Sequence, residues 1–209
     1  MSDDGTQRRS VRERSKAAFR AAILSAAESV FTREGFSAAK MADIAAEAGV
    51  AAGTLYNYFG SKEEIFQSII SSGMTELSEE VETASREPDP IARLRRMTEV
   101  MLAFLNARGS LFLIYVQMQG GPDMESLSSA IEHAEIRKWH LGLLTQAATE
   151  AQGQQNLRTD IDPQTLVLAL TGITHGFITR WAEEGCAPGE LARHVDTIFE
   201  LFLKGCQSP

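Results

Sequence analysis

The chain has 209 residues, of which 44% are hydrophobic, and a formal net charge of −8 at pH 7. This length and apolar content suit a globular protein with one large or two small domains. No apolar run approaches the roughly 20 residues needed to cross a bilayer, and the amino terminus lacks a signal-peptide core. Only two cysteines occur, Cys186 and Cys206, which argues against a disulfide framework. We therefore expect a cytoplasmic protein that does not bind membranes.

The charges are divided unevenly along the chain. Residues 1–62 hold 9 Lys and Arg against 7 Asp and Glu, a net of +2, whereas residues 63–209 hold 11 against 21, a net of −10. Because a polyanion repels acidic surfaces, only the amino-terminal part suits nucleic acid. Six basic residues cluster there: Arg8, Arg9, Arg12, Arg14, Lys16 and Arg20. We expect residues 1–15 to form a flexible basic arm, which either contacts DNA or is only a solvated tail.

Apolar spacing predicts three helices within the first sixty residues. One set recurs with a 3.6-residue period: Phe19, Ile23, Ala26 and Val30. With Gly35 as a left-handed cap, this set predicts a helix over about 15–34. A short second helix from Met41 ends at Gly49, and a third begins at about Ala51. Two short helices around a glycine turn are typical of a helix-turn-helix, although many other all-α proteins also contain them.

The third helix combines core anchors with exposed polar groups. Leu55 and Phe59 lie four residues apart and can anchor the core, while Tyr56 and Asn57 point away from it. A tyrosine hydroxyl can bond a phosphate oxygen, and Lys62 at a helix start can meet another phosphate. The segment is therefore suited to contact a DNA backbone.

The rest of the chain is also predicted to be helical, which makes the fold class all-α. Ser61 and Glu64 have capping-box spacing, so a fourth helix should start at about residue 62 and end near residue 85. The pairs Asp89-Pro90 and Asp162-Pro163 predict the starts of two more helices. The remaining expected helices cover the following approximate ranges: 90–107, a short one after 110, 123–151, 163–184 and a last one ending near 204.

Three motifs in the first third occur in a fixed order: Phe31-Thr-Arg-Glu-Gly-Phe36, Met41-Ala-Asp-Ile-Ala-Ala-Glu-Ala-Gly-Val50 and Gly53-Thr-Leu-Tyr-Asn-Tyr-Phe-Gly-Ser-Lys62. Together they resemble the amino-terminal domain of the tetracycline-repressor (TetR) family, over about residues 16–70. The loop Leu157–Pro163 is similar to one that often precedes the penultimate helix of these regulators. The resemblance implies a homodimeric transcriptional regulator, usually a repressor released from a double-stranded DNA operator by a small molecule.

The resemblance also implies domains and site residues. Residues 16–62 would form the helix-turn-helix domain, and residues 63–209 the effector-binding and dimerisation domain. The positions of phosphate contacts in the family match Lys40, Thr54, Asn57, Tyr58 and Lys62. The positions that reach base edges match Ala42, Ala52, Gly53 and Tyr56.

The alanines at 42, 51 and 52 replace longer polar side chains of many relatives. Sequence preference would then depend on Tyr56, on alanine contacts with thymine methyl groups and on DNA shape. For Tyr58, packing against the first helix is the alternative to a phosphate contact.

A helical bundle often has a ligand pocket between its central helices. Methionine and aromatic side chains adapt to irregular ligands, which makes the following residues the candidates for an effector site: Met97, Met101, Phe104, Phe112, Tyr115, Met118, Trp139 and His175. Plain core packing is the alternative for each. The acidity of the bundle favours an apolar or cationic effector. We expect no cofactor and no metal, because His133 and His140 lack a third ligand at suitable spacing.

The last two helices carry more apolar residues than one buried face of each requires. They are Leu166, Leu170, Ile173, Phe177, Ile178, Trp181, Leu191, Val195, Ile198, Phe199, Leu201 and Phe202. We expect these helices to pair with their symmetry mates in a C₂ dimer.

Two other functions stay open. The chain could be a dimeric adaptor that acts through protein partners, or an all-α enzyme with a pocket in its bundle. No nucleophile elbow, HExxH motif or phosphate-binding glycine loop occurs, so we expect no enzyme.

Overall fold

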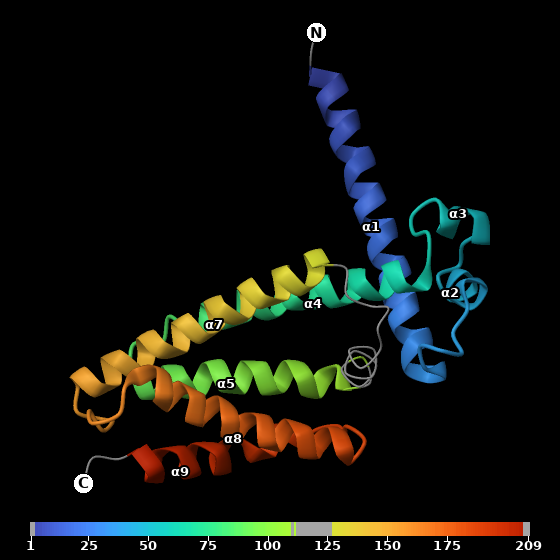
Figure 1. Ribbon diagram of the computed structural model, residues 1–209. Coiled ribbons are helices and arrows are strands. Elements are labelled where there is room, and N and C mark those ends of the chain that lie inside the picture. The colour runs from blue at the N-terminus through green and yellow to red at the C-terminus, as the bar shows by residue number, and fades with distance from the viewer. Residues whose placement is uncertain (1–2, 110, 112–126, 207–209) are drawn as a thin grey trace. The chain divides into compact units, whose positions relative to one another are not determined.

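The computed structural model describes residues 3–109, 111 and 127–206, with backbone alone for 3–13, 127–134 and 206. All regular elements in these ranges are helices, which confirms the all-α class (Figure 1). The chain forms two compact units, Met1–Gly73 and Met74–Pro209. The division falls inside helix α4 (Lys62–Ala84), beyond the boundary after residue 62 expected from the sequence. Within the described ranges, no helix has the length and apolar character needed to span a membrane.

The first unit begins with a long helix, α1 (Asp3–Glu34), followed by α2 (Met41–Glu47) and α3 (Ala52–Tyr56). Helix α1 starts at Asp3 rather than near residue 15, so the expected flexible arm is helical in the structure. The residues that follow Gly5 are mainly Arg, Glu, Gln, Lys and Ala, which are strong helix formers. Their charge suggested a solvated tail, but their helix propensity favours continuation of α1.

Two glycines in the left-handed region end α1 and α2, as predicted. Gly35 has φ of 79° and donates its N–H to the carbonyl of Phe31 at 2.9 Å. Gly49 has φ of 67°, and the following Val50 donates to the carbonyl of Ala45 at 2.9 Å. Residues with a Cβ atom adopt this region at a cost, which explains glycine at both turns.

An aromatic cluster joins the end of α1 to the first turns of α4. The ring centroid of Phe66 lies 5.8 Å from that of Phe31 and 5.3 Å from that of Phe36. From α2 and α3, Ile44 and Leu55 are fully buried. Helices as short as α2 and α3 are not stable alone, so burial of these two side chains holds the helix-turn-helix together.

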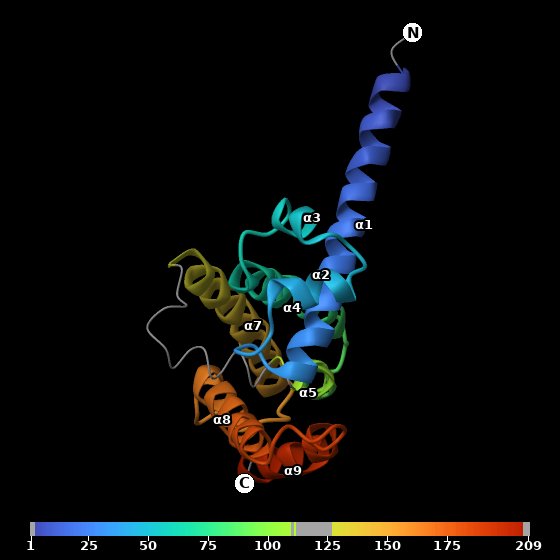
Figure 2. The same ribbon diagram turned by 90° about the vertical axis from the view of Figure 1, so that its right-hand side faces the viewer.

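The second unit is a helical bundle that also includes the later turns of α4. Its other elements are α5 (Pro90–Ala107), α7 (Leu127–Gly153), α8 (Pro163–Glu183), the short 3₁₀ helix η1 (Leu191–His194) and α9 (Val195–Cys206). Helix α5 packs against α7 and also against η1 and α9, while α7 packs against α8. Helix α8 also packs against α9, and Figures 1 and 2 show α5, α7, α8 and α9 lying side by side.

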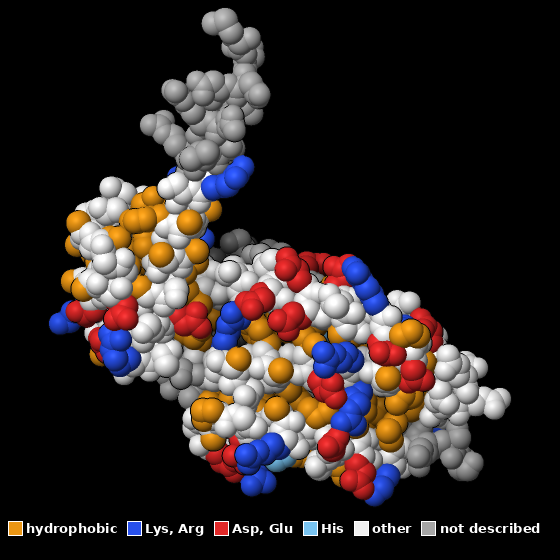
Figure 3. Space-filling view, turned by 180° about the vertical axis from the view of Figure 1, so that it is seen from behind, with side chains coloured by type: hydrophobic (Ala, Val, Ile, Leu, Met, Phe, Trp, Pro, Cys, Tyr) orange, Lys and Arg blue, Asp and Glu red, His pale blue; other side chains and the backbone are white. Residues whose placement is uncertain are grey.

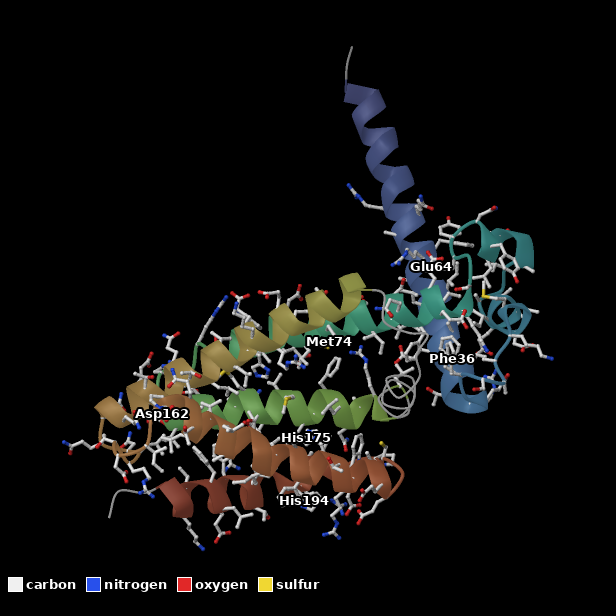
Figure 4. All side chains as sticks on the ribbon, viewed as in Figure 1. Phe36, Glu64, Met74, Asp162, His175 and His194 are labelled. Carbon is white, nitrogen blue, oxygen red and sulfur yellow. The ribbon has the colours of Figure 1, made fainter. Side chains whose placement is uncertain are left out.

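Both Asp–Pro pairs cap helices as predicted. The Asp89 carboxylate accepts the N–H of Ala92 at 2.7 Å at the start of α5. Asp162, labelled in Figure 4, accepts the N–H of Thr165 at 2.9 Å at the start of α8. The hydrogen bond from the Thr165 side chain is the main reason that the pKa of the Asp162 carboxyl is lowered. Each carboxylate thus satisfies an amide that the helix itself leaves without a partner.

The helix expected after residue 110 lies largely outside the described residues. Leu111 is described and is buried. The start of the next expected helix, near residue 123, also lies outside them. The described helix α7 begins at Leu127 and ends at Gly153, slightly beyond the expected end near 151.

The apolar residues of α8 and α9 are used mainly by the core of this chain. The buried members of the expected set are Leu166, Leu170, Ile178, Trp181, Leu191, Val195, Ile198, Phe199 and Phe202. Of the residues singled out in the sequence, only Leu201 is largely exposed, at 52%. Leu168, which was not singled out, is 70% exposed. The apolar surplus is therefore smaller than the sequence indicated, because α7 packs against α8, α5 packs against α9, and α8 and α9 pack against each other.

Gly109 is packed so closely that it leaves no room for a side chain. A Cβ atom at this position would lie 2.8 Å from the Cβ of Cys186 and 3.0 Å from the ring of Trp181. Trp181 is fixed by a hydrogen bond from its Nε1 to the carbonyl of Ala187 at 2.9 Å. We expect Gly109→Ala to lower the free energy of unfolding by about 1–3 kcal/mol, as overpacking of a core does. Urea denaturation measures this change.

Gly142→Ala is the matched control for that prediction. Gly142 is exposed within α7, and a Cβ atom there would meet nothing within 4 Å. Alanine is the better helix former, so this substitution should raise the free energy of unfolding by up to about 1 kcal/mol. Equal effects of the two substitutions would contradict the proposed crowding at Gly109.

Candidate nucleic-acid interface

Helices α2 and α3 present most of the predicted DNA-binding residues on the surface of the first unit. The exposed ones are Lys40, Ala42, Ala52, Gly53, Tyr56 and Asn57, while Thr54, Tyr58 and Lys62 are half-buried. The buried side of α3 is anchored by Leu55, which is fully buried. The sequence therefore divides α3 into a core side and an exposed side, as its pattern predicted.

Tyr56 and Gly53 are weakly constrained by the rest of the first unit. Tyr56 is 55% exposed, the largest exposed hydrophobic side chain described in this unit. A Cβ atom built on Gly53 would meet nothing within 4 Å. Glycine weakens a helix by about 1 kcal/mol relative to alanine, and no packing within the described chain requires it here.

Tyr58 packs on α1 with its ring. The centroids of the Phe19 and Tyr58 rings are 5.2 Å apart at an interplanar angle of 35°. The packing expected as the alternative is therefore present, and Tyr58 is still partly exposed. Because packing already holds the ring, the hydroxyl could bond a phosphate without further loss of side-chain freedom. The phosphate contact of Tyr58 stays a prediction.

Lys62 has a position that the sequence did not indicate. Its Nζ donates to the carbonyls of Phe36, Ser37 and Ala39 at 2.8, 3.2 and 3.1 Å. The ammonium group also lies 4.8 Å from the centroid of the Phe36 ring. An ammonium group has three N–H donors, and these carbonyls are enough to engage all of them. This geometry gives Lys62 a structural role and lends no support to its predicted phosphate contact.

The start of α4 is capped by a variant of the predicted box. The N–H of Glu64 donates to Ser61 Oγ at 3.1 Å, as expected. The Glu64 carboxylate, however, accepts the N–H of Gly60 at 2.7 Å. Figure 4 labels Glu64 in the first turn of α4. The cap fixes the turn that carries the chain from α3 into α4.

Half of the basic side chains described in the first unit have partners inside it: those of Arg20, Arg33 and Lys62. Arg20 donates to Ser68 Oγ at 2.8 Å, with its guanidinium carbon 5.0 Å from the centroid of the Phe59 ring. Arg33 forms an ion pair with Glu47 at 3.2 Å. Lys40 is exposed next to the start of α2 and forms no ion pair with the described residues. Its ammonium group is therefore available to a phosphate.

The structure does not gather the predicted effector residues into one described cavity. Met97 is fully buried in the core, Met101 and Phe104 are half-buried against it, and Trp139 and His175 are exposed. The other three, Phe112, Tyr115 and Met118, lie outside the described residues. For Met97, core packing explains the position without a ligand, because its side chain lies within the interior of the bundle.

A groove described in the second unit has a different lining and a volume of about 680 Å³. It is formed by α4, α5 and the loop between them, and its lining is Glu76, Glu79, Glu80, Thr83, Ala84, Arg86, Glu87, Pro88, Arg96 and Val100. Figure 3 shows acidic and basic side chains interspersed over one face of this unit. In the part of the chain that the structure describes, no three His, Cys, Asp or Glu residues are grouped as a metal site.

Comparison with known proteins identifies the helix-turn-helix. Residues 23–69 match the family model described as bacterial regulatory proteins, tetR family. The HTH-type transcriptional regulator TtgR of Pseudomonas putida is 27% identical over 193 residues, which cover 88% of this chain and 90% of that protein. Residues 23–69 therefore carry the DNA-binding domain of tetR-family regulators, and the whole chain is similar to proteins of that family. It is a DNA-binding transcriptional regulator and not an enzyme.

Solved structures of tetR-family regulators extend the similarity to both units. PfmR, a TetR family transcriptional regulator from Thermus thermophilus, aligns with a TM-score of 0.71 and 25% identity, over 87% of this chain and 97% of that one. FadR from Bacillus subtilis, solved in complex with stearoyl-CoA, aligns with a TM-score of 0.67 and 24% identity, over 88% and 97%. The fold of this chain therefore matches theirs over most of its length.

Proposed function

We propose that this regulator is a homodimeric repressor that binds a near-palindromic operator through α2 and α3 and is released by a small molecule. The observation that carries the proposal is the exposed side of α3, where Tyr56 is 55% exposed and a Cβ atom on Gly53 would meet nothing within 4 Å. A glycine without a side chain lets the backbone approach DNA closely, and the exposed tyrosine can reach a base edge or a phosphate. Such a regulator would act in the cytoplasm, where the operator is.

Selection of bound sequences from random double-stranded DNA tests the operator. The expected result is a near-palindromic consensus whose half-sites are about one helical turn apart, as two copies of α3 require. The affinity for the selected DNA should fall with salt concentration, with a logarithmic slope of about −0.9 for each phosphate neutralised. A protein that acts mainly as an adaptor would give no consensus and only weak binding at low salt.

Tyr56→Phe tests the exposed hydroxyl of α3. Because the side chain is 55% exposed, the substitution should leave the free energy of unfolding unchanged. A hydrogen bond contributes about 1 kcal/mol, so its loss in both copies should weaken operator binding by about 2 kcal/mol, or roughly 30-fold. Fluorescence anisotropy with the selected operator measures the change. Unchanged affinity would show that the Tyr56 hydroxyl contacts neither base nor phosphate.

The proposed dimer face consists of Leu168 on α8 and Leu201 on α9. They are 70% and 52% exposed, respectively, on the two last helices of the chain. On α8, Gly172 and Gly176 follow Leu168 at intervals of four residues, and a Cβ atom on either would meet nothing within 4 Å. An exposed leucine followed by glycines on α8, together with the exposed leucine of α9, gives apolar surface against which a second copy can pack. These features support the expected interface of the last two helices.

Release by a small molecule requires an element that both units share. Helix α4 is that element: Ile65 and Phe66 are buried in the first unit, while Val81 and Ala84 belong to the core of the second. A ligand in the second unit can favour release only if it binds the DNA-free state more tightly. A shift of the population from 1:99 to 99:1 needs about 5.5 kcal/mol of differential binding. The complex of FadR with stearoyl-CoA supports the idea that a ligand is bound in a fold of this kind.

A further inference from the structure

Two half-buried polar side chains, Asn106 and His140, lie at the ends of buried stripes on α5 and α7. On α5, one stripe recurs every four residues: Leu94, Thr98, Leu102 and Asn106. On α7, a second stripe recurs every three or four residues: His140, Leu144, Ala147 and Ala151. Residues at these intervals share one side of a helix, and every other member of both stripes is buried. Asn106 and His140 therefore continue the buried sides of their helices.

The two polar residues lie at the same end of the contact between α5 and α7. The helices run antiparallel (Figure 1), and Arg93 Nη1 bonds Glu150 Oε2 across them at 2.8 Å. With a rise of about 1.5 Å per residue, Asn106 lies about 20 Å along α5 from this pair and His140 about 15 Å along α7. Their levels along the helix axes thus differ by about 5 Å.

Each side chain buries an atom that has no hydrogen-bond partner. Asn106 Oδ1 and His140 Nε2 are both buried, and no group among the described residues bonds either of them. Thr98, on the same stripe as Asn106, differs because its Oγ1 donates to the carbonyl of Leu94 at 2.9 Å. Buried polar atoms are normally bonded, and an unbonded one costs folding free energy. Burial also lowers the pKa of the His140 imidazole, so it is neutral at pH 7.

Three partly buried apolar side chains lie near Asn106 and His140 along the same helices, and the guanidinium carbon of Arg108 lies 4.6 Å from the centroid of the Phe104 ring. Met101 and Phe104 precede Asn106 on α5, and Leu143 follows His140 on α7. All three are only partly buried and pack against the core. Methionine and aromatic residues accommodate irregular apolar shapes. A polar pair within such a lining is typical of a ligand site, in which a few polar groups fix the orientation.

We propose that Asn106 and His140 recognise a neutral, mainly apolar ligand that carries hydroxyl groups. The inference rests on the proposed function, since this ligand would be the effector. A hydroxyl can donate to Asn106 Oδ1, and it can donate to or accept from His140 Nε2 in either neutral tautomer. Neither side chain supplies a negative charge for a cation, so this site favours the apolar over the cationic class of effector expected from the sequence.

Matched probe pairs test the ligand class. The probes are 2-naphthol with naphthalene and 4-hydroxybiphenyl with biphenyl, titrated calorimetrically into the full-length protein at about pH 7.5, a value chosen to keep both phenols neutral. We expect at least one hydroxylated probe to bind at least about tenfold more tightly than its partner, which corresponds to one good hydrogen bond. The double variant Asn106→Leu with His140→Leu should lose this preference. Absence of a hydroxyl preference in both pairs, or its persistence in the double variant, would overturn the proposal.

Thermal unfolding supplies a readout that needs no ligand. Asn106→Leu and His140→Leu should each raise the midpoint temperature, because an apolar side chain replaces an unbonded polar one. Thr98→Val is the control: it removes a bonded hydroxyl at a buried position of the same stripe and should not raise the midpoint. A lower midpoint in both leucine variants would show that a structural partner, such as an internal water, satisfies these atoms and would overturn the proposal.

Operator binding by the same proteins separates this inference from the proposed function. Wild type and the leucine variants should bind the selected operator alike in the absence of a probe. If all of them bind it and the hydroxyl preference is missing, only the ligand assignment fails. If the wild type selects no operator, the proposed repressor function fails, whatever the probes show.

Discussion

Leu168→Glu is expected to leave the protein monomeric and to weaken operator binding by about 100-fold or more. The side chain is 70% exposed on α8, so the substitution should not disturb the fold of one chain. In the proposed dimer, the two-fold axis brings Leu168 of both copies into the same apolar contact. Burying an unpaired carboxylate costs several kcal/mol, and it does so in both copies. A monomer then reads only half of the operator and loses the product of two half-site affinities.

Sedimentation velocity and fluorescence anisotropy measure the two effects of this substitution. Leu141→Glu is the control, because Leu141 is also exposed, at 39%, but lies on α7 rather than on the last two helices. That variant should stay dimeric and bind the operator as the wild type does. If Leu168→Glu forms a dimer with normal operator affinity, the interface lies elsewhere on the protein.

Lys62→Met is expected to lower the free energy of unfolding by about 2–3 kcal/mol. The ammonium group of Lys62 bonds three carbonyls in the turn after α1, at 2.8 to 3.2 Å. A hydrogen bond to a charged group contributes about 1.5–3 kcal/mol, but these three bonds are partly exposed to solvent, so we expect about 3–4 kcal/mol from them together. An opposing contribution of up to about 1 kcal/mol comes from removing a cation from the start of α4. The carbonyl bonds should therefore dominate, as urea denaturation can show.

Lys40→Met tests a phosphate contact that is expected to have no effect on the stability of the fold. Lys40 is exposed, and in the described part of the chain it forms no ion pair, so the free energy of unfolding should change by less than about 0.5 kcal/mol. If it contacts a phosphate, the logarithmic salt slope of operator binding should lose about 0.9 for each copy. Lys62→Met should keep the wild-type slope. A stable Lys62→Met protein with a reduced slope would instead assign Lys62 to a phosphate.

The sequence predicted well those features that depend on neighbouring residues. Gly35 and Gly49 marked the ends of α1 and α2, because the left-handed conformation is a local property of the backbone. Asp89 and Asp162 marked the starts of α5 and α8, because a cap bonds an amide three residues further along. The same local reasoning placed the helix-turn-helix and its exposed residues on α3.

Features that depend on distant residues were not predictable in this way. The carbonyls that bond Lys62 belong to residues 23 to 26 positions earlier, and no spacing rule connects them. The apolar residues of α8 and α9 suggested a large external surface, but their burial depends on how α5, α7 and α9 pack around them. Asn106 and His140 went unrecognised as a pair, since only the antiparallel register of α5 and α7 brings them to one end of the contact.

Helix α4 links the folding of the two units because it supplies both hydrophobic cores. Ile65, Phe66 and Ile69 on its first half are buried in the first unit, and Leu77 and Val81 on its second half are buried in the bundle. Unfolding of either core would leave half of α4 without packing partners. Fraying of that half would then extend into the half of α4 that belongs to the other core. Heat should therefore denature the whole chain in one cooperative transition, and the excised head, residues 1–73, should have a lower melting temperature than the intact protein. The protein would therefore lose DNA binding whenever its helical bundle unfolds.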